Sequence, residues 1–130
     1  MSRATVPALA LLALLTTACA SSVDSVTVGG ERIAVAPLVD GHRALCQAAA
    51  RPDNARALFF DRSHEALHAV ARAMEDVDRA QAGELLQAKE KVESGLVEPP
   101  ATLPDDLRRL AGVYRTALGR LAIEAKPCDK

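Results

Sequence analysis

Apolar residues at helical spacing, separated by proline-containing breaks, constrain the fold of this 130-residue chain more than any other feature. The breaks fall at Arg51-Pro52, at Pro99-Pro100 and at Pro127, and helices usually end at such positions. The segments between them predict helices at 39–50, from 53 or 54 to about 77, at 82–93, and from 102 through Leu121 to a point before Pro127. Because the connections are short, we expect an all-α fold, a small antiparallel four-helix bundle over residues 38–130.

Capping residues mark the predicted helix ends. Asp53 or Asn54 can cap the second helix, Gly95 ends the third, and Thr102 with Asp105 three residues later resembles a capping box for the fourth. The side chains that we expect in the core follow the helical period: Leu58, Phe60, Leu67, Val70, Ala71, Met74 and Val77, then Leu85, Leu86 and Val92, then Leu107, Leu110, Val113, Tyr114, Ala117 and Leu121.

The segment before the bundle, residues 19–37, is interpreted as a tether. Within it, residues 26–28 and 32–35 flank Gly29-Gly30 and could pair as a small hairpin. An isolated hairpin is marginally stable, so an extended tether is the alternative.

Residues 1–18 have the organisation of an export signal. Arg3 precedes an apolar stretch over residues 6–15, which is too short to span a bilayer, and small residues lead to Cys19. A small residue directly before a cysteine at this place resembles the lipobox of bacterial lipoproteins. That resemblance implies that Cys19 carries a diacylglyceryl group (palmitate or a similar acyl chain) and anchors the protein to the outer face of the cell membrane.

Ordinary signal-peptide cleavage is the alternative for the same residues. Ala18-Cys19-Ala20 fits a small-x-small cleavage site, and Thr16 stands where the lipobox usually has Leu, Val or Ile. In that case Cys19 is removed and the product is secreted as a soluble protein.

Two further cysteines, Cys46 and Cys128, remain in the folded part after either cleavage. In an exported chain an even number of cysteines favours a disulfide, and we expect a Cys46–Cys128 bridge. Two separate buried thiols are the alternative. Neither cysteine belongs to a CxxC pair, so their spacing does not indicate a metal site.

Composition excludes some partners. The chain has 16 Lys and Arg against 17 Asp and Glu without a block of like charge, and its aromatic residues are two Phe and one Tyr. A neutral surface with few rings does not favour nucleic acid. We expect a membrane contact through the lipid and a protein partner at the cell envelope.

One motif could carry chemistry. His64-Glu65-Ala66-Leu67-His68 is an HExxH sequence inside the predicted second helix, so both imidazoles lie on one face and can reach one ion. The chain resembles zincin metallopeptidases in these five residues, which implies zinc held by His64 and His68 with Glu65 as the general base. If the second and third helices fold back around Arg79, Glu93 comes level with His64 as the third ligand.

Three interpretations of the motif remain open. The histidines are structural, or they bind a metal without catalysis, or they form a peptidase site. Glu84 and Glu90 lie on either side of the sequence distance from His68 at which zincins have their third ligand. His42, Asp61 and Glu75 could contribute from nearby positions. On a helical wheel Glu65 points to solvent.

The leading interpretation is therefore a non-enzymatic, exported, membrane-tethered helical domain that acts as a binding or accessory module without a cofactor. The alternative is a zinc-binding protein or a zinc-dependent hydrolase.

Overall fold

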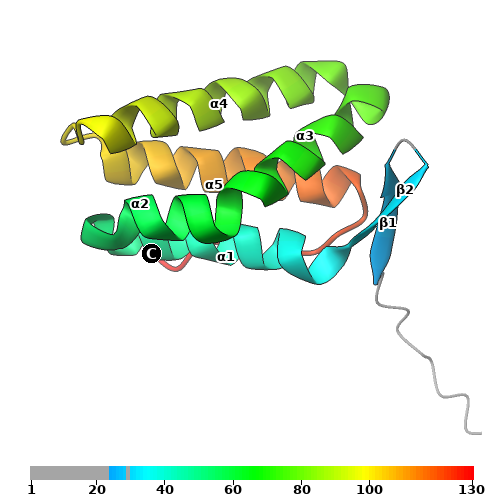
Figure 1. Cartoon of the computed structure of the whole chain (residues 1–130), viewed down its shortest axis with the longest axis horizontal. Coiled ribbons are helices and arrows are strands. Elements are labelled where there is room, and N and C mark those ends of the chain that lie inside the picture. The colour runs from blue at the N-terminus through cyan, green and yellow to red at the C-terminus, as the bar shows by residue number, and fades with distance from the viewer. Residues whose placement is uncertain (1–23, 29) are drawn as a thin grey trace, which may run out of the picture.

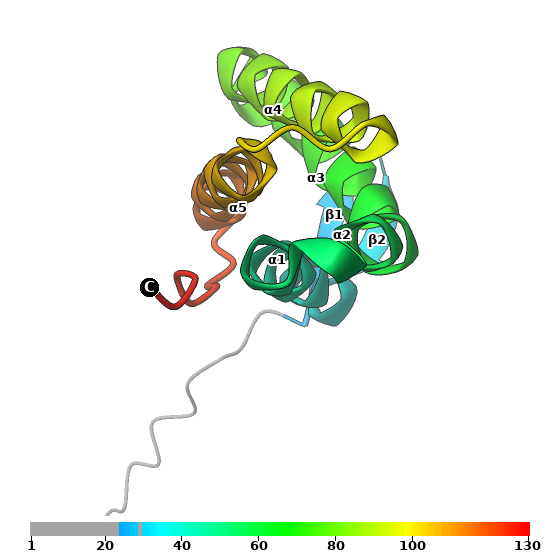
Figure 2. The same cartoon turned by 90° about the vertical axis from the view of Figure 1, so that its left-hand side faces the viewer.

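Four helical rods form the body of the protein (Figures 1 and 2). The structure, a computed structural model, describes residues 24–28 and 30–130. The predicted signal segment 1–18 and the proposed lipidation site Cys19 lie outside the described residues. The all-α bundle is confirmed, and within the described ranges no helix has both the length and the apolar content needed to cross a bilayer.

A two-stranded hairpin precedes the bundle. Strand β1 (Ser25–Val28) pairs antiparallel with β2 (Glu31–Ala34), Val26 opposite Ile33, and Gly30 has a φ of 83°. The hairpin is therefore present, and the extended tether is wrong for these residues. It lies at the end of the bundle where α1 begins (Figure 1).

Helix α1 (Val35–Ala50) follows β2 directly. It begins four residues before the predicted helix start at 39. Pro37 does not prevent this earlier start, because N–H groups in the first turn of a helix have no intrahelical partner. Val35, which we predicted in the second strand, is the first helical residue.

The second rod contains a π-helical turn. A short 3₁₀ turn η1 (Pro52–Asn54) leads into α2 (Ala55–Leu58), the π turn η2 (Phe59–Ser63) and α3 (His64–Val77). Neither Asp53 nor Asn54 caps the rod through its side chain, contrary to prediction.

The π turn changes which residues face the core. Ala55, Phe59, Ser63 and Leu67 are all buried at intervals of four residues, whereas an ideal α-helix would rotate by about 40° at each such step. The wider π turn keeps all four on one face. Phe60, predicted to point inward, is 42% exposed, and Phe59 takes its place in the core.

Helix α4 (Arg79–Val97) is separated from the end of α3 by one residue, Asp78. Asp78 makes this tight turn possible, because its carboxylate accepts a hydrogen bond from the Gln81 N–H at 3.1 Å and pairs with Arg120 Nη2 at 2.7 Å. The helix extends beyond the predicted 82–93. Gly95 does not end it but lies buried inside it, where an added Cβ would be 3.3 Å from Leu103.

Helix α5 (Leu103–Arg120) completes the bundle. Thr102 precedes it, but the Thr102 hydroxyl donates to Asp106 Oδ2 at 3.2 Å instead of capping a backbone N–H. The predicted capping box with Asp105 was therefore wrong.

The C-terminal end of α5 is closed by a Schellman motif. Ala122 adopts a φ of 60°, and the Ile123 N–H bonds to the Leu118 carbonyl at 2.9 Å. Ile123 and Leu118 are both buried beside this turn.

The core lies between the four rods and is made mainly of Leu, Ala and Val side chains together with Phe59, Met74 and Tyr114. The Tyr114 hydroxyl donates to the Leu38 carbonyl at 2.7 Å, which ties α5 to α1. Val77 and Leu86, predicted in the core, are exposed instead. Val77 is in α3 and Leu86 is in α4, the two helices that are joined at Asp78.

Helices approach one another closely at Gly41 of α1. A Cβ atom there would lie 2.7 Å from the Ala66 Cβ and 3.2 Å from the Arg62 carbonyl oxygen. The Ser63 hydroxyl donates to the Gly41 carbonyl at 2.8 Å, and Arg62 forms two hydrogen bonds to Asp40, at 2.7 and 3.0 Å. This crossing requires glycine for steric reasons.

The Cys46–Cys128 disulfide is confirmed, with a Cα–Cα separation of 5.2 Å. It fastens the non-helical tail after α5 against α1, across 82 residues of sequence. In the chain-entropy model a closed loop of this length stabilises the folded state by about 4–5 kcal/mol.

We predict that Gly41→Ala lowers the free energy of unfolding by about 1–3 kcal/mol, because the new methyl overlaps Ala66. Gly112→Ala is the matched control. It lies within α5 with nothing within 4 Å of the added Cβ, and it should raise stability by about 0.5–1 kcal/mol. Urea unfolding of both variants measures the difference, and equal stabilities would contradict the close crossing.

Candidate functional site

His64 and His68 lie one turn apart on α3, and their ring centroids are 4.7 Å apart with the planes at 80°. His64 begins α3 immediately after the π turn and is half-buried, whereas His68 is exposed. The rings of Phe59 and Phe60 lie 6.0 and 5.6 Å from the His64 ring and cover one side of it.

Glu93 of α4 meets this pair. Its Oε1 atom lies 3.1 Å from His64 Nε2. The two residues lie side by side on the antiparallel helices α3 and α4, because His64 is 14 positions before the turn at Asp78 and Glu93 is 15 positions after it. Glu84 and Glu90, which straddle the zincin spacing, are exposed residues of the same helix.

Lys89 of α4 lies beside Glu93. It is only 6% exposed, and its ammonium donates to the same Glu93 oxygen at 2.7 Å. The ammonium therefore already neutralises the carboxylate that would have to bind a cation. The pKa of His68 is lowered, first by burial and then by the positive charges of Lys89 and His64.

The three predicted ligands are neighbours but do not form a closed ligand set. Among the described residues, the group of three or more His, Cys, Asp or Glu whose ligand atoms all lie within 4.8 Å of one another is His42, Cys46 and Cys128. His64, His68 and Glu93 do not meet that distance. Binding one ion with all three residues requires Lys89 to release Glu93 and the ligand atoms to move closer together.

Glu65 does not face the cluster. Its side chain is 93% exposed and lies 3.5 Å from His64 Nδ1, on the side opposite Nε2 and Glu93. A general base must reach a water bound to the ion, and this side chain would have to swing around the helix to do so. Ser63, directly before His64, is buried and bonded to the Gly41 carbonyl, so it serves the helix crossing.

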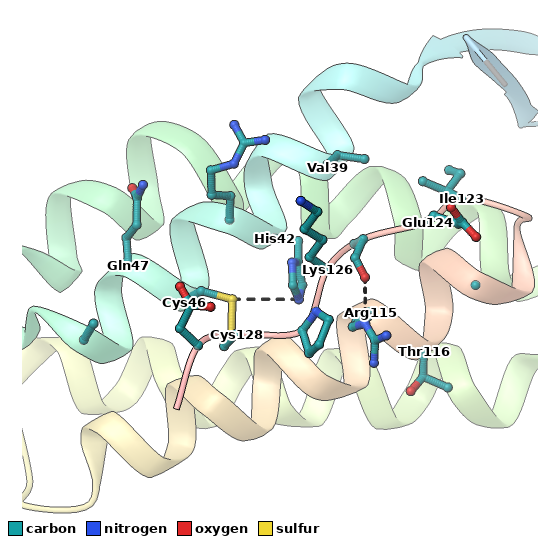
Figure 3. A pocket seen from close by; sticks show the side chains of 16 residues that line it. Val39, His42, Cys46, Gln47, Arg115, Thr116, Ile123, Glu124, Lys126 and Cys128 are labelled. Atoms are coloured by element: carbon teal, nitrogen blue, oxygen red, sulfur yellow. Dashed lines mark hydrogen bonds between the residues drawn. A yellow bond between two sulfur atoms is a disulfide. The ribbon is translucent and has the colours of Figure 1, made fainter. Parts of the chain in front are cut away.

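The second cluster surrounds His42 of α1 (Figure 3). The His42 ring is 3% exposed and stacks on Tyr114 at a centroid distance of 6.2 Å. Its Nε2 lies 4.0 Å from Cys46 Sγ. His42 therefore belongs with the disulfide and α5, and the structure does not place it with His64 and His68.

A groove runs beside this cluster between α1, α5 and the tail (Figure 3). Charged side chains of both signs line it: Arg43, Arg115, Glu124, Lys126 and Asp129. The Arg115 Nε donates to the Ala125 carbonyl at 2.7 Å, which holds the tail along α5.

The grouping of His42 with the two cysteines was not predicted from the sequence. His42 and Cys46 are four residues apart in one helix, which places them on one face, and this spacing was the available signal. The predicted disulfide would then have brought Cys128 to the same place.

Comparison with known proteins adds no assignment. The chain matches no protein-family model, no curated protein and no solved structure.

Burial lowers the pKa of His42, assisted by the positive charge of Arg115 and opposed by a hydrogen bond to the backbone of Ala111. A depressed histidine pKa means that the unfolded chain binds the proton more readily than the folded protein. Stability is therefore complete above the ordinary pKa of 6.5 and declines as the pH falls below it.

We predict that His42→Gln reduces this loss of stability between about pH 6.5 and pH 5, where the slope for one group is at most about 1.4 kcal/mol per pH unit. Thermal melting at several pH values measures it. His68 also has a lowered pKa, so His68→Gln is the control for an exposed histidine and should have the smaller effect. Parallel pH profiles for wild type and His42→Gln would refute the assignment.

Proposed function

We propose that this protein is an exported bacterial lipoprotein, anchored through Cys19, whose helical domain is a non-enzymatic binding or accessory module at the cell envelope. The observation that carries the export is the Cys46–Cys128 disulfide, because such bonds persist in oxidising compartments and are rare in the cytosol. The export-like segment 1–18 agrees with that compartment.

The short spacing between Cys19 and the domain supports a position close to the membrane. Strand β1 begins at Ser25, so six residue steps separate it from the proposed lipid. Even a fully extended chain of this length reaches only about 20 Å. The hairpin and the adjoining end of the bundle would therefore face the headgroup region, and the far end of the bundle is the part best placed to meet a protein partner.

Polar groups in the interior support a scaffold rather than a catalytic centre. Ser63 and Tyr114 use their hydroxyls on backbone carbonyls of α1. In the described part of the chain every buried side-chain nitrogen or oxygen has a hydrogen-bond partner. These groups serve helix packing, and the surface remains for binding.

We predict that labelled palmitate enters the wild-type protein in a bacterial host and does not enter Cys19→Ser. The thioether needs the cysteine sulfur, and serine has none. Ser21→Ala is the control and should be labelled like the wild type. An unmodified product beginning at Ser21, measured by intact mass, would contradict lipidation and favour a soluble secreted protein.

Binding of a transition-metal ion by His64, His68 and Glu93 is the second candidate function. The 3.1 Å contact between His64 Nε2 and Glu93 Oε1 favours it, since imidazole and carboxylate are zinc ligands. The Lys89 ammonium opposes it through its bond to the same carboxylate. We therefore propose weak zinc binding, with peptidase activity dependent on Glu65 as the more distant possibility.

We predict that calorimetric titration of the disulfide-bonded protein with Zn²⁺ at neutral pH gives weak binding, reduced at least tenfold by His64→Ala and by Glu93→Gln. Lys89→Met should strengthen binding, because it frees the Glu93 carboxylate. Glu90→Gln, an exposed glutamate of the same helix, is the control and should change nothing.

Binding that His64→Ala leaves unaffected would remove this site. If the wild type cleaves a peptide substrate in the presence of zinc and Glu65→Gln does not, the peptidase interpretation replaces simple binding.

A further inference from the structure

The disulfide corner brings together three groups that are ligands for thiophilic metals. Cys46 Sγ, Cys128 Sγ and a ring nitrogen of His42 lie within 4.8 Å of one another. Figure 3 shows the His42 ring directed at the Cys46 sulfur, with the tail that carries Cys128 passing beside both. His42 is 3% exposed and stacks on Tyr114, so its position beside the two sulfurs is fixed by packing.

We propose that reduction of the Cys46–Cys128 disulfide converts this corner into a zinc site in which Cys46, Cys128 and His42 bind one Zn²⁺. In the oxidised protein both cysteine sulfurs are in the disulfide and neither is a thiolate. The site therefore cannot bind zinc until the disulfide is reduced. The site is distinct from the His64 cluster and goes beyond the proposed function.

The present distances suit such a site. Zn–S bonds of about 2.3 Å and Zn–N bonds of about 2.0–2.1 Å in a tetrahedron place the ligand atoms about 3.5–3.8 Å apart. Cys46 Sγ and His42 Nε2 are already 4.0 Å apart. They are one turn apart on the same helix, so α1 keeps this half of the site in place.

The remaining ligand is on the part of the chain that can adjust. After reduction the two sulfurs must separate to the spacing of zinc ligands, and Cys128 lies in the non-helical tail beyond α5. The groove beside the corner gives water access to the fourth coordination position (Figure 3). Three protein ligands and one open position are typical of an accessible zinc site.

Charge balance selects a divalent ion. Two thiolates and a neutral imidazole carry a charge of −2, which Zn²⁺ cancels, so the half-buried corner holds no net charge. The Tyr114 ring fixes the plane of His42 by stacking, and such outer contacts orient metal ligands.

Atoms and electrons balance with an external dithiol as the reductant. The dithiol gives two electrons and two protons to the two cysteine sulfurs and leaves as its own disulfide. Zinc binding then displaces both thiol protons into solvent. In the reverse step an external disulfide takes two electrons from the two thiolates and two protons from solvent, leaves as its dithiol, and the ion is released.

The test uses the purified protein, reduced anaerobically with a phosphine that is then removed. Zn²⁺ is titrated in competition with a chromophoric chelator, and circular dichroism follows helix content in the same samples. We expect one Zn²⁺ per chain in the reduced protein, at least tenfold weaker binding in the oxidised protein, and at least tenfold weaker binding in reduced His42→Gln. Reduced Glu90→Gln, at an exposed position of α4, is the control and should bind zinc like the reduced wild type.

A second measurement identifies the ligands. Co²⁺ should give a thiolate-to-metal charge-transfer band in the reduced wild type and none in the Cys46→Ser/Cys128→Ser variant. Equal zinc affinity of reduced His42→Gln and reduced wild type would overturn the proposal. Equal affinity of the reduced and oxidised proteins would also overturn it, as would a reduced protein that loses its helices and does not regain them with zinc.

Discussion

The close crossing of α1 over the π turn determines where the other helices lie. Gly41 lets the Ser63 hydroxyl reach its carbonyl oxygen, while Arg62 pairs with Asp40 at the outer edge of the contact. The extra width of the π turn keeps Phe59 and Ser63 on the core side at this point. Since α3 continues the same rod, the crossing also sets the direction of His64. Its Nε2 therefore faces α4 and Glu93.

The disulfide organises the other side of the molecule. Without it, the tail after α5 would be held mainly by the Schellman motif and by the bond between Arg115 and the Ala125 carbonyl. With it, the tail lies against α1, covers His42 and forms one wall of the groove. One covalent bond therefore supports both the proposed compartment and the proposed redox-dependent zinc site. The two inferences remain separable, because the first needs only the oxidised state and the second needs the reduced one.

Much of the fold was predictable from local patterns, and the errors have identifiable causes. The helical stripes identified Leu67, Val70, Met74 and Tyr114 as core residues, because these side chains repeat with the α-helical period. Phe60 was misassigned because a π turn resets that period and leaves no mark in composition. Gly95 was taken as a helix end, whereas the packing of Leu103 and Pro100 against it allows α4 to continue.

The sequence by itself determined the helical class and the matching positions of His64 and Glu93 along the paired helices, because both follow from counting residues along helices joined by a short turn. It favoured the Cys46–Cys128 pair for another reason, the even number of cysteines in the folded part of an export-like chain. Only the tertiary structure determined which polar side chains contact one another. Lys89 is bonded to Glu93, and His42 lies beside the disulfide. These contacts depend on the rotation of each helix about its own axis. The apolar stripe of each helix indicates that rotation only roughly, and close packing at points such as Gly41 fixes it.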